Sequence, residues 1–297
     1  MKVTITGSTG FVGQNLIPYL SKFKFEVDSL NRDELSSELK FDNTNVIIHL
    51  AGKAHDLRKT ANPEEYYKVN YELTKKLYDT FLQSKAEKFI FISSVKAAAD
   101  AIDGILTEDF VPKPMTDYGK SKLMAEEYIR SQPLPLGKTY YILRPCMIHG
   151  PGNKGNLNLL YQFVKRGIPY PLARFTNKRS YLSIENFCFI VKKILEYDIA
   201  SGVYNLADDE ALSTNDVIAT LAKSSKNKGS MWFIPQKIVI FMAKIGDVLN
   251  LPLTSERLKK LTENYIVDNK KLKEALGVHL PLSSQEGIRI TADSFLS

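Results

Sequence analysis

Hydrophobic residues along this chain recur in short continuous runs that alternate with longer amphipathic segments. Five runs are rich in β-branched and aromatic residues and read as strands: residues 2–5, 25–30, 45–50, 88–92 and 139–143. The third run is apolar on both sides of its pleat, as expected of a parallel strand buried on both faces. Between the runs, residues 63–85 and 118–131 carry helical patterns. This alternation predicts an α/β fold built on a doubly wound parallel sheet, which binds ligands at the carboxyl ends of its strands.

A glycine-rich turn, TGSTGFVG at residues 6–13, joins the first strand to the first helix. Gly7 can supply a tight turn, Gly10 allows the backbone to approach a pyrophosphate, and Gly13 lets the helix pack on the sheet. The helix N-terminus also offers unpaired N–H groups to phosphate. We therefore predict a dinucleotide site of the Rossmann type here; the alternative is a purely structural glycine turn.

The strand–helix alternation loosens after residue 150. We expect a dinucleotide-binding Rossmann domain over residues 1–150, with a return segment near 180–205. Residues 151–297 would form mainly a substrate-binding lobe. Residues 232–258 read as lobe helices, and their apolar face is expected to serve packing rather than membrane anchoring.

The tip of the second strand bears on which dinucleotide is bound. A carboxylate there would accept both ribose hydroxyls and select NAD, whereas an arginine would pair with a 2′-phosphate. The tip reads Asn31, then Arg32 and Asp33. This order favours NADP(H). NAD(H) stays possible, with Arg32 pointing to water and Asp33 on the ribose.

Three polar side chains predict acid–base chemistry. Tyr118 and Lys122 lie four positions apart and share one face of the predicted helix, and Ser94 follows the fourth strand. A free tyrosine titrates near pH ~10, and a nearby ammonium is expected to lower that value. The phenol could then exchange a proton with a substrate oxygen that Ser94 also holds. The alternative for the tyrosine–lysine pair alone is a solvated helix face.

With these motifs the chain resembles the extended short-chain dehydrogenase/reductases that act on nucleotide sugars. The resemblance covers nearly the whole chain and rests on six segments: TGSTGFVG at 6–13, HLAG at 49–52, ISS at 92–94, YGKSK at 118–122, LRPCMIHGPG at 143–152 and RSYLSIEN at 179–186.

The resemblance implies roles for individual residues. Tyr118 is implied as the catalytic acid/base, Lys122 as its partner and a ligand of the nicotinamide ribose, and Ser94 as the third member, which also touches substrate. A structural role is implied for Asn70. The remaining cofactor contacts would come from Gly7, Gly10, Phe11, Val12, Gly13, Asn31, Arg32, Leu50, Ala51, Gly52, Pro145 and Cys146.

On the substrate side, the resemblance implies that Arg179 binds the nucleotide diphosphate and that Asn158 lies near the nucleotide. Arg257 is a possible second phosphate ligand, and a guanidinium fork suits a diphosphate better than a lysine does. The alternative for each is a surface side chain. Two positions depart from the family pattern, because Met147 replaces a sugar-side asparagine and His149 replaces a tyrosine. Only 16 residues separate Asp33 from His49 (49 − 33), which is short for the family.

The segment at residues 150–180 most resembles enzymes that reduce the 4-keto group of a UDP-linked 6-deoxy sugar for surface polysaccharides. A 4-epimerase of the UDP-galactose or UDP-N-acetylglucosamine type is the alternative. An epimerase benefits from retained NAD⁺, whereas a reductase consumes a reduced cofactor at each turnover, so Asn31 and Arg32 favour the reductase. A dinucleotide-sensing binding protein without catalysis is a third reading. The intact set of Ser94, Tyr118 and Lys122 argues against it.

Bulk composition adds few constraints. The net charge is +7 but the basic residues are spread along the chain, so we expect no nucleic-acid partner. The two cysteines, Cys146 and Cys188, lack metal-ligand spacing, and we expect reduced thiols and no metal. No signal peptide and no membrane span are expected, which favours the cytoplasm. A homodimer through the helices that carry Asn70 and Tyr118 is implied by the resemblance alone.

Overall fold

The computed structural model describes residues 1–37, 39–41, 43–53, 62–153, 155–225, 230–249, 251 and 253–295. Its centre is a six-stranded parallel sheet with the strand order β10-β6-β4-β3-β1-β2. The strands are β1 (Lys2–Thr6), β2 (Glu26–Leu30), β3 (Val46–His49), β4 (Lys88–Ile92), β6 (Thr139–Pro145) and β10 (Gly202–Leu206). The predicted α/β fold with a doubly wound sheet is confirmed. The strand β10 joins the sheet from the return segment expected near residues 180–205.

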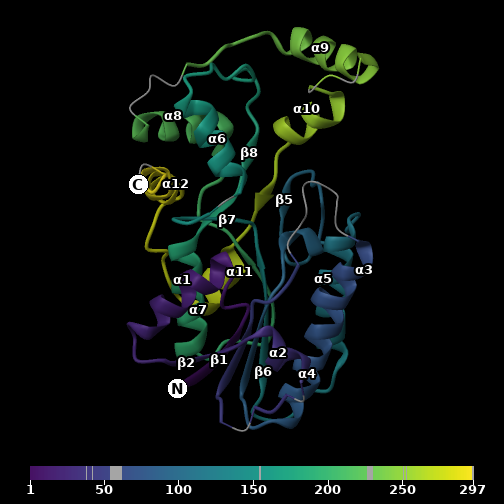
Figure 1. The fold of residues 1–297 in the computed structure, drawn as a ribbon, viewed down its shortest axis with the longest axis vertical. Coiled ribbons are helices and arrows are strands. Elements are labelled where there is room, and N and C mark those ends of the chain that lie inside the picture. The colour runs from purple at the N-terminus through teal and green to yellow at the C-terminus, as the bar shows by residue number, and fades with distance from the viewer. Residues whose placement is uncertain are drawn as a thin grey trace.

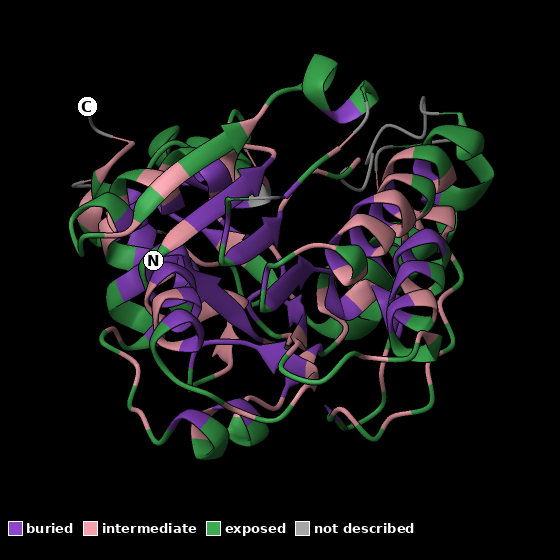
Figure 2. Cartoon of the chain, turned by 90° about the horizontal axis from the view of Figure 1, so that it is seen from below, coloured by how far each residue is buried: buried purple, intermediate pink, exposed green. Residues whose placement is uncertain are grey.

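Helices cover both faces of the sheet. Helices α1 (Phe11–Ser21) and α7 (Ile184–Glu196) lie on one face, and α4 (Leu73–Gln83) and α5 (Asp117–Ser131) lie on the other (Figure 1). Figure 2 shows the inner strands buried between helices whose outer surfaces are exposed, whereas the edge strand β2 is largely exposed. The sheet is therefore the middle of a three-layer sandwich, as expected when its strands are apolar on both sides.

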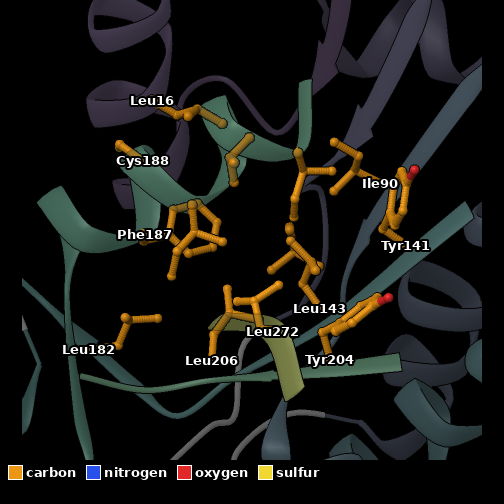
Figure 3. Close-up of a cluster of buried hydrophobic side chains, with 14 of the residues drawn as sticks. Leu16, Ile90, Tyr141, Leu143, Leu182, Phe187, Cys188, Tyr204, Leu206 and Leu272 are labelled. Carbon is orange, nitrogen blue, oxygen red and sulfur yellow. The ribbon is translucent and has the colours of Figure 1, made fainter. Parts of the chain in front are cut away.

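The pleat divides the strand residues between two hydrophobic clusters. Ile48 and Ile90 contribute to the cluster under α1 and α7, whereas Ile47 and Phe89 contribute to the cluster under α4 and α5. Figure 3 shows the first cluster, in which side chains from both helices meet those of β4, β6 and β10. Neighbouring residues of one strand thus hold opposite helix layers in place.

The predicted helix over residues 63–85 is one helical segment with a wider turn inside it. It consists of α3 (Pro63–Tyr66), the π-helix η1 (Tyr67–Glu72) and α4. Asn62 caps its start by accepting a hydrogen bond from the backbone N–H of Glu64 at 3.1 Å. Single π-turns inside α-helices are frequently found at functional sites, and this one carries the buried Asn70.

The rest of the chain forms short elements and a third hydrophobic cluster, which includes Leu157, Tyr161, Leu221 and Ile288. The elements are α2 (Arg32–Ser36), η2 (Val95–Ala97), β5 (Ile105–Leu106), β7 (Met147–His149), α6 (Asn156–Lys165), β8 (Lys178–Arg179), β9 (Tyr181–Ser183), β11 (Leu212–Ser213), α8 (Thr214–Ser224), α9 (Gln236–Leu249), α10 (Ser255–Thr262), β12 (Ile266–Val267), α11 (Lys270–Leu276) and α12 (Ser284–Asp293). Helices α6, α8, α9 and α10 lie in the upper part of Figure 1. The domain boundary at residue 150 stays a prediction.

Helices α9 and α10 occupy the stretch at residues 232–258 where lobe helices were expected, with residues 250 and 252 outside the described ranges. The expectation that their apolar face serves packing is wrong for α9. Only Val239, Ala243 and Gly246 of that helix are buried, and most of its large apolar side chains are exposed. No helix within the described ranges is long and apolar enough to cross a bilayer.

A buried ion pair fastens α5 to the sheet. The Arg144 guanidinium of β6 donates through Nε to both carboxylate oxygens of Glu126 at 3.0 and 3.1 Å, and both side chains are almost fully buried. The Ser93 hydroxyl also donates to Glu126. Burying two charges is tolerable here because the carboxylate is paired and hydrogen-bonded at both oxygens.

We predict that Glu126→Gln lowers the free energy of unfolding by about 3–5 kcal/mol, because it leaves the Arg144 charge buried without a countercharge. The measurement is urea denaturation at neutral pH. Glu127→Gln is the matched control, since Glu127 is exposed on the same helix, and it should change stability by less than about 0.5 kcal/mol. Similar losses in both variants would contradict the role given to the buried pair.

Candidate active site

Parallel pairing brings the polar ends of four strands to one edge of the sheet. The register aligns Thr6 of β1 with His49 of β3, and Ile92 of β4 with Leu143 of β6. The glycine turn, the Leu50–Gly52 segment, Ser94 and Cys146 each follow one of these strands. Residues far apart in the sequence therefore meet at the edge where such sheets bind their ligands.

The glycine turn has the shape that a dinucleotide pyrophosphate requires. Gly7 has φ +76°, and a Cβ there would lie 2.6 Å from the backbone nitrogen of Ala51. A Cβ on Gly13 would lie 2.5 Å from the Gly7 carbonyl oxygen, so this glycine permits the tight turn. At Gly10, which is exposed, a Cβ would meet only the Gly7 oxygen at 3.4 Å.

Gly10 is also the N-cap of α1, and no side chain caps that end of the helix. The first N–H groups of α1 are therefore free to bind phosphate at a place the backbone leaves open. These residues fit a dinucleotide. Phe11 and Val12 begin the helix and are half-buried, packed against the cluster under α1 and α7.

At the tip of β2, Asn31 caps a helix, whereas Arg32 and Asp33 are exposed. The Asn31 side chain caps α2 by accepting from the backbone N–H groups of Asp33 and Glu34 at 2.9 and 3.0 Å. The Glu34 carboxylate accepts from the Asn31 backbone N–H at 2.7 Å, which completes a capping box. Arg32 and Asp33 are exposed in the first turn of α2. Asn31 thus has a local structural task, and the predicted contact between its side chain and the cofactor stays a prediction, as does that of Arg32.

Tyr118 lies in the first turn of α5, where Thr116 caps the helix through the Gly119 backbone N–H at 3.2 Å. Gly119 makes the position of this turn possible, because a Cβ there would collide with the Lys96 carbonyl oxygen and with Pro114. The helix can therefore approach the turn after β4 closely. In that arrangement the Ser94 side chain lies close enough to Tyr118 to act on the pKa of its phenol.

The pKa of Tyr118 is raised, whereas the sequence predicted a lowered value. Burial raises the pKa of Tyr118 above its usual value, and the nearby Ser94 hydroxyl lowers it by a smaller amount. We expected Lys122 to lower this pKa, but Ser94 is the group that does so in the structure. Without bound cofactor the phenol is therefore protonated at neutral pH.

Lys122 lies one helical turn along and points into the protein. Its ammonium donates to the Ile92 carbonyl oxygen at 2.9 Å and sits 4.8 Å from the centre of the Phe91 ring. A Cβ on Gly52 would lie 3.1 Å from this ammonium, so the glycine leaves it room beside the Leu50–Gly52 segment. Burial lowers the pKa of Lys122 from 10.5 to about 8, against an opposite effect of Glu126.

Asn70 links the segment after β3 to helix α5. Its amide oxygen accepts from the Lys53 backbone N–H at 2.8 Å, and its amide nitrogen donates to the Ser121 hydroxyl at 3.0 Å. It therefore ties the segment after β3 to α5 between Tyr118 and Lys122. This agrees with the structural role implied by the resemblance.

A buried hydrogen-bond chain through His49 was missed by the sequence reasoning. Thr74 donates to the Asn70 carbonyl oxygen at 2.7 Å, so it can only accept from His49 Nε2 at 2.9 Å. His49 Nδ1 then accepts from the Thr6 hydroxyl at 2.7 Å, and Thr6 accepts from the Ala51 N–H at 3.1 Å. Burial lowers the pKa of His49 to about 3, which keeps the ring neutral as this chain requires. The strand-end position in HLAG was the only available signal.

Pro145 ends β6 and Cys146 follows it, and both are buried beside the same edge. The Cys146 backbone N–H donates to the Leu206 carbonyl oxygen at 3.0 Å, which fixes this strand against β10. Burial raises the pKa of the Cys146 thiol, so it is protonated at neutral pH. Both cysteines are free thiols. Within the described ranges no three His, Cys, Asp or Glu residues form a metal site.

The predicted substrate residues lie on three separate elements. Arg179, on β8, donates to the carbonyl oxygens of Lys260 and Glu263 at the end of α10. Arg257 is exposed on α10, and Asn158 is half-exposed in the first turn of α6. The fold thus brings Arg179 beside the helix that carries Arg257, while Asn158 belongs to a different part of the lobe. Their substrate contacts stay predictions.

The two departures from the family pattern have different surroundings. Met147 is exposed on β7. His149 is fully buried, with Nδ1 at 2.9 Å from the Thr291 hydroxyl and Nε2 at 3.8 Å from the Asp208 carboxylate. His149 therefore binds β7 to α12, and the lobe uses it for packing. It also lines a cavity of about 320 Å³ between α1, α7 and α12 that contains none of Ser94, Tyr118 and Lys122.

Comparison with known proteins agrees with this geometry. The family described as "NAD dependent epimerase/dehydratase family" matches residues 3–207. The chain is 32% identical to a UDP-glucose 4-epimerase of Vibrio cholerae, over 99% of this chain and 95% of that protein. It is 26% identical to a UDP-2-acetamido-2,6-beta-L-arabino-hexul-4-ose reductase of Pseudomonas aeruginosa, over 68% of this chain and 52% of that protein.

Two solved structures share the fold over nearly the whole chain. RMD from Pseudomonas aeruginosa, complexed with NADPH, has a TM-score of 0.76 at 19% identity and covers 99% of this chain and 98% of its own. The UDP-glucuronic acid 4-epimerase of Bacillus cereus, in complex with NAD, has a TM-score of 0.76 at 20% identity. It covers 99% of this chain and 96% of its own. One neighbour thus holds NADPH and the other NAD.

We predict that Lys122→Met stabilises the cofactor-free protein at pH 7 by up to roughly 3 kcal/mol, because each unit of the lowered pKa corresponds to about 1.4 kcal/mol. The unfolded lysine binds its proton below pH 10.5, whereas the folded one does so only below about 8. The penalty is thus complete below pH 8 and is relieved between about 8 and 10.5. Urea denaturation of the variant and the original protein at pH 7 and at pH 10 measures the gain in stability at each pH. A gain that fails to shrink at pH 10 would contradict this account.

Proposed function

The chain belongs to the NAD dependent epimerase/dehydratase family, and from that premise we propose that it reduces the C4 keto group of a UDP-linked 4-keto-6-deoxy-hexose. It is an NAD(P)-dependent enzyme of nucleotide-sugar chemistry at C4. The observation that carries the proposal is the approach of Ser94 and Tyr118, close enough for Ser94 to lower the pKa of the phenol, at the strand edge that also bears the glycine turn. Surface polysaccharide synthesis is the process that would use such a product.

A bound reduced nicotinamide would supply the hydride to C4. The Tyr118 phenol would donate its proton to the C4 oxygen as that oxygen gains negative charge. The Ser94 hydroxyl would hydrogen-bond the same oxygen and hold it beside the phenol. The Lys122 ammonium, one helical turn along α5, would stabilise the phenolate that remains until solvent returns the proton.

The protonation state of Tyr118 supports the reductive direction. A reductase needs a proton donor at the start of the reaction, and a phenol with a raised pKa holds its proton at neutral pH. The buried carboxylate of Glu126 opposes part of the desolvation of Lys122, which favours the charged ammonium. Both groups are thus in the forms that donation to a ketone oxygen requires.

NADP(H) is the cofactor we propose, because Arg32 is exposed at the tip of β2 and Asn31 is committed to capping α2. An arginine there suits a 2′-phosphate. Asp33, exposed in the same turn, is the residue that would instead suit the ribose of NAD.

We propose that Arg179 binds the substrate diphosphate and that Asn158 and Arg257 contribute nearby. Arg179 lies close enough to Lys96 to lower its pKa, although burial lowers the pKa of Lys96 more. Lys96 follows Ser94 by two positions, so the guanidinium lies toward the catalytic edge. A UDP-linked sugar would then extend from β8 toward Ser94.

A UDP-sugar 4-epimerase is the second candidate. It is favoured by the likeness to the Vibrio cholerae epimerase, which extends over 99% of this chain. The two candidates share the roles of Ser94, Tyr118 and Lys122, and they differ in whether the oxidised cofactor stays bound between turnovers. The homodimer through η1, α4 and α5 stays a prediction, which the mass in solution tests.

We predict that Tyr118→Phe lowers kcat by about 10²- to 10⁴-fold and leaves dinucleotide affinity nearly unchanged, because it removes the proton donor alone. Turnover of a UDP-4-keto-6-deoxy-hexose and dinucleotide titration are the measurements. Tyr67→Phe is the matched control, since this nearby half-buried phenol donates only to Asp117. Turnover within a few-fold of the original would disprove the acid role. It would also revive the dinucleotide-sensing alternative.

Cofactor use separates the reductase from the epimerase. We predict that the purified protein releases no nucleotide on denaturation and binds NADPH more tightly than NADH. Arg32→Ala should raise the KM for NADPH about tenfold or more and change that for NADH little, because it removes a charge-assisted contact with the 2′-phosphate. Arg130→Ala, at the exposed end of α5, is the control. Near-stoichiometric release of NAD⁺ would instead assign the protein to the epimerases.

A further inference from the structure

Helix α9 presents an apolar surface to solvent at one end of the molecule. It lies with α10 at the top of Figure 1, at the end of the long axis opposite the sheet. Seven of its large apolar side chains are between 38% and 79% exposed. All of them except Ile240 lie on one side of the helix, and we call these six residues the α9 face: Ile238, Phe241, Met242, Ile245, Val248 and Leu249. Scattered exposed apolar residues are ordinary, but six on one helix form a contiguous surface that indicates a partner.

The spacing of these residues places them on one side of the helix. They recur at intervals of three and four, which is the period of an amphipathic helix. The opposite side is committed to the fold, because Val239 and Ala243 join the third hydrophobic cluster together with Leu258 of α10. Gly246 packs so closely on the Leu253 backbone that no Cβ would fit. The α9 face therefore points away from the protein.

The charges around the α9 face are positive. Lys237 and Lys244 are exposed on the same helix and lie along one edge of the apolar stripe. The only carboxylate of the helix, Asp247, accepts hydrogen bonds from the Ser255 backbone and hydroxyl at 2.9 and 2.5 Å, which turns it toward α10. The exposed Arg174 adds a third cation near the start of the helix, where its Nε donates to the Phe233 carbonyl oxygen at 3.3 Å.

We propose that the α9 face docks on the surface of an anionic phospholipid bilayer. Its apolar side chains would enter the boundary between headgroups and acyl chains, while Lys237 and Lys244 would bind lipid phosphates. An apolar stripe bordered by lysines is the pattern of helices that lie in the plane of a membrane. This revises the sequence-based expectation of no membrane partner, and it does not depend on the direction of the C4 chemistry.

A second copy of the chain is the competing occupant of this surface. In a symmetric dimer the same patch faces itself, so Lys237 and Lys244 of each copy would approach those of the other. The helix offers no free carboxylate to offset that repulsion, because Asp247 is bound to Ser255. An anionic lipid surface instead attracts every cation along the rim.

The test uses the full chain and vesicles of phosphatidylglycerol mixed with phosphatidylcholine, compared with phosphatidylcholine alone. Co-sedimentation measures binding, and Trp232 reports insertion, since it is the single tryptophan and precedes Gln236 by four positions (236 − 232). The test variant is Phe241→Ser/Val248→Ser. The matched control is Val111→Ser/Leu136→Ser, which removes two equally exposed apolar side chains elsewhere.

We expect binding to the anionic vesicles with a blue shift of Trp232 emission. The test variant should weaken binding about tenfold or more and the control should leave it unchanged. Only the test variant removes apolar side chains that would be buried in the bilayer. A second variant, Lys237→Gln/Lys244→Gln, should reduce the preference for phosphatidylglycerol.

Three results would overturn the proposal: no binding to either vesicle, equal binding by the test and control variants, or no effect of anionic lipid. Sedimentation velocity distinguishes the competing occupant. A loss of dimer mass in Phe241→Ser/Val248→Ser, without vesicle binding by the original protein, would assign the α9 face to a second copy.

Discussion

The carboxylate of Glu126 holds the candidate active site together. It accepts hydrogen bonds from Arg144 at the end of β6 and from Ser93 at the end of β4. Because Glu126 is on α5, this one group fixes the helix against two strands. Tyr118 and Lys122 lie earlier on the same helix, and Ser94 follows Ser93 directly. The spacing of the three candidate catalytic side chains thus depends on a buried ion pair that itself takes no part in the chemistry.

Close backbone approach is the second condition for the site. Gly119 lets the start of α5 come against the Lys96 carbonyl, and Gly52 leaves room for the Lys122 ammonium. Burial then sets the protonation states, since it raises the pKa of Tyr118 and lowers that of Lys122. The glycines of the motifs therefore allow the backbone segments to pack closely. Loss of hydration on burial shifts the pKa values of Tyr118 and Lys122.

The sequence identified the main elements of the sheet because parallel buried strands form continuous apolar runs with polar ends. It also singled out Ser94 and Tyr118 as candidate site residues, because each follows a recognisable boundary between a strand or loop and the next element, and their catalytic roles stay predictions. It missed the chain from Thr6 through His49 to Asn70, since a histidine at a strand end carries no local sign of its partners. It also misjudged the helix around Phe241, where an amphipathic period indicates an apolar side without saying what covers it.

What the sequence determined by itself is therefore local: the strands, the glycine turn, the helix that carries Tyr118 and Lys122, and the family motifs. What only the tertiary structure decided is which distant groups meet. Asn31 caps a helix, His149 packs against α12, Arg179 binds the end of α10, and the α9 face stays exposed. The physical reason is that periodicity and turn chemistry act within a few residues. Burial, electrostatics and hydrogen-bond partners are instead set by neighbours up to 170 positions apart in the chain.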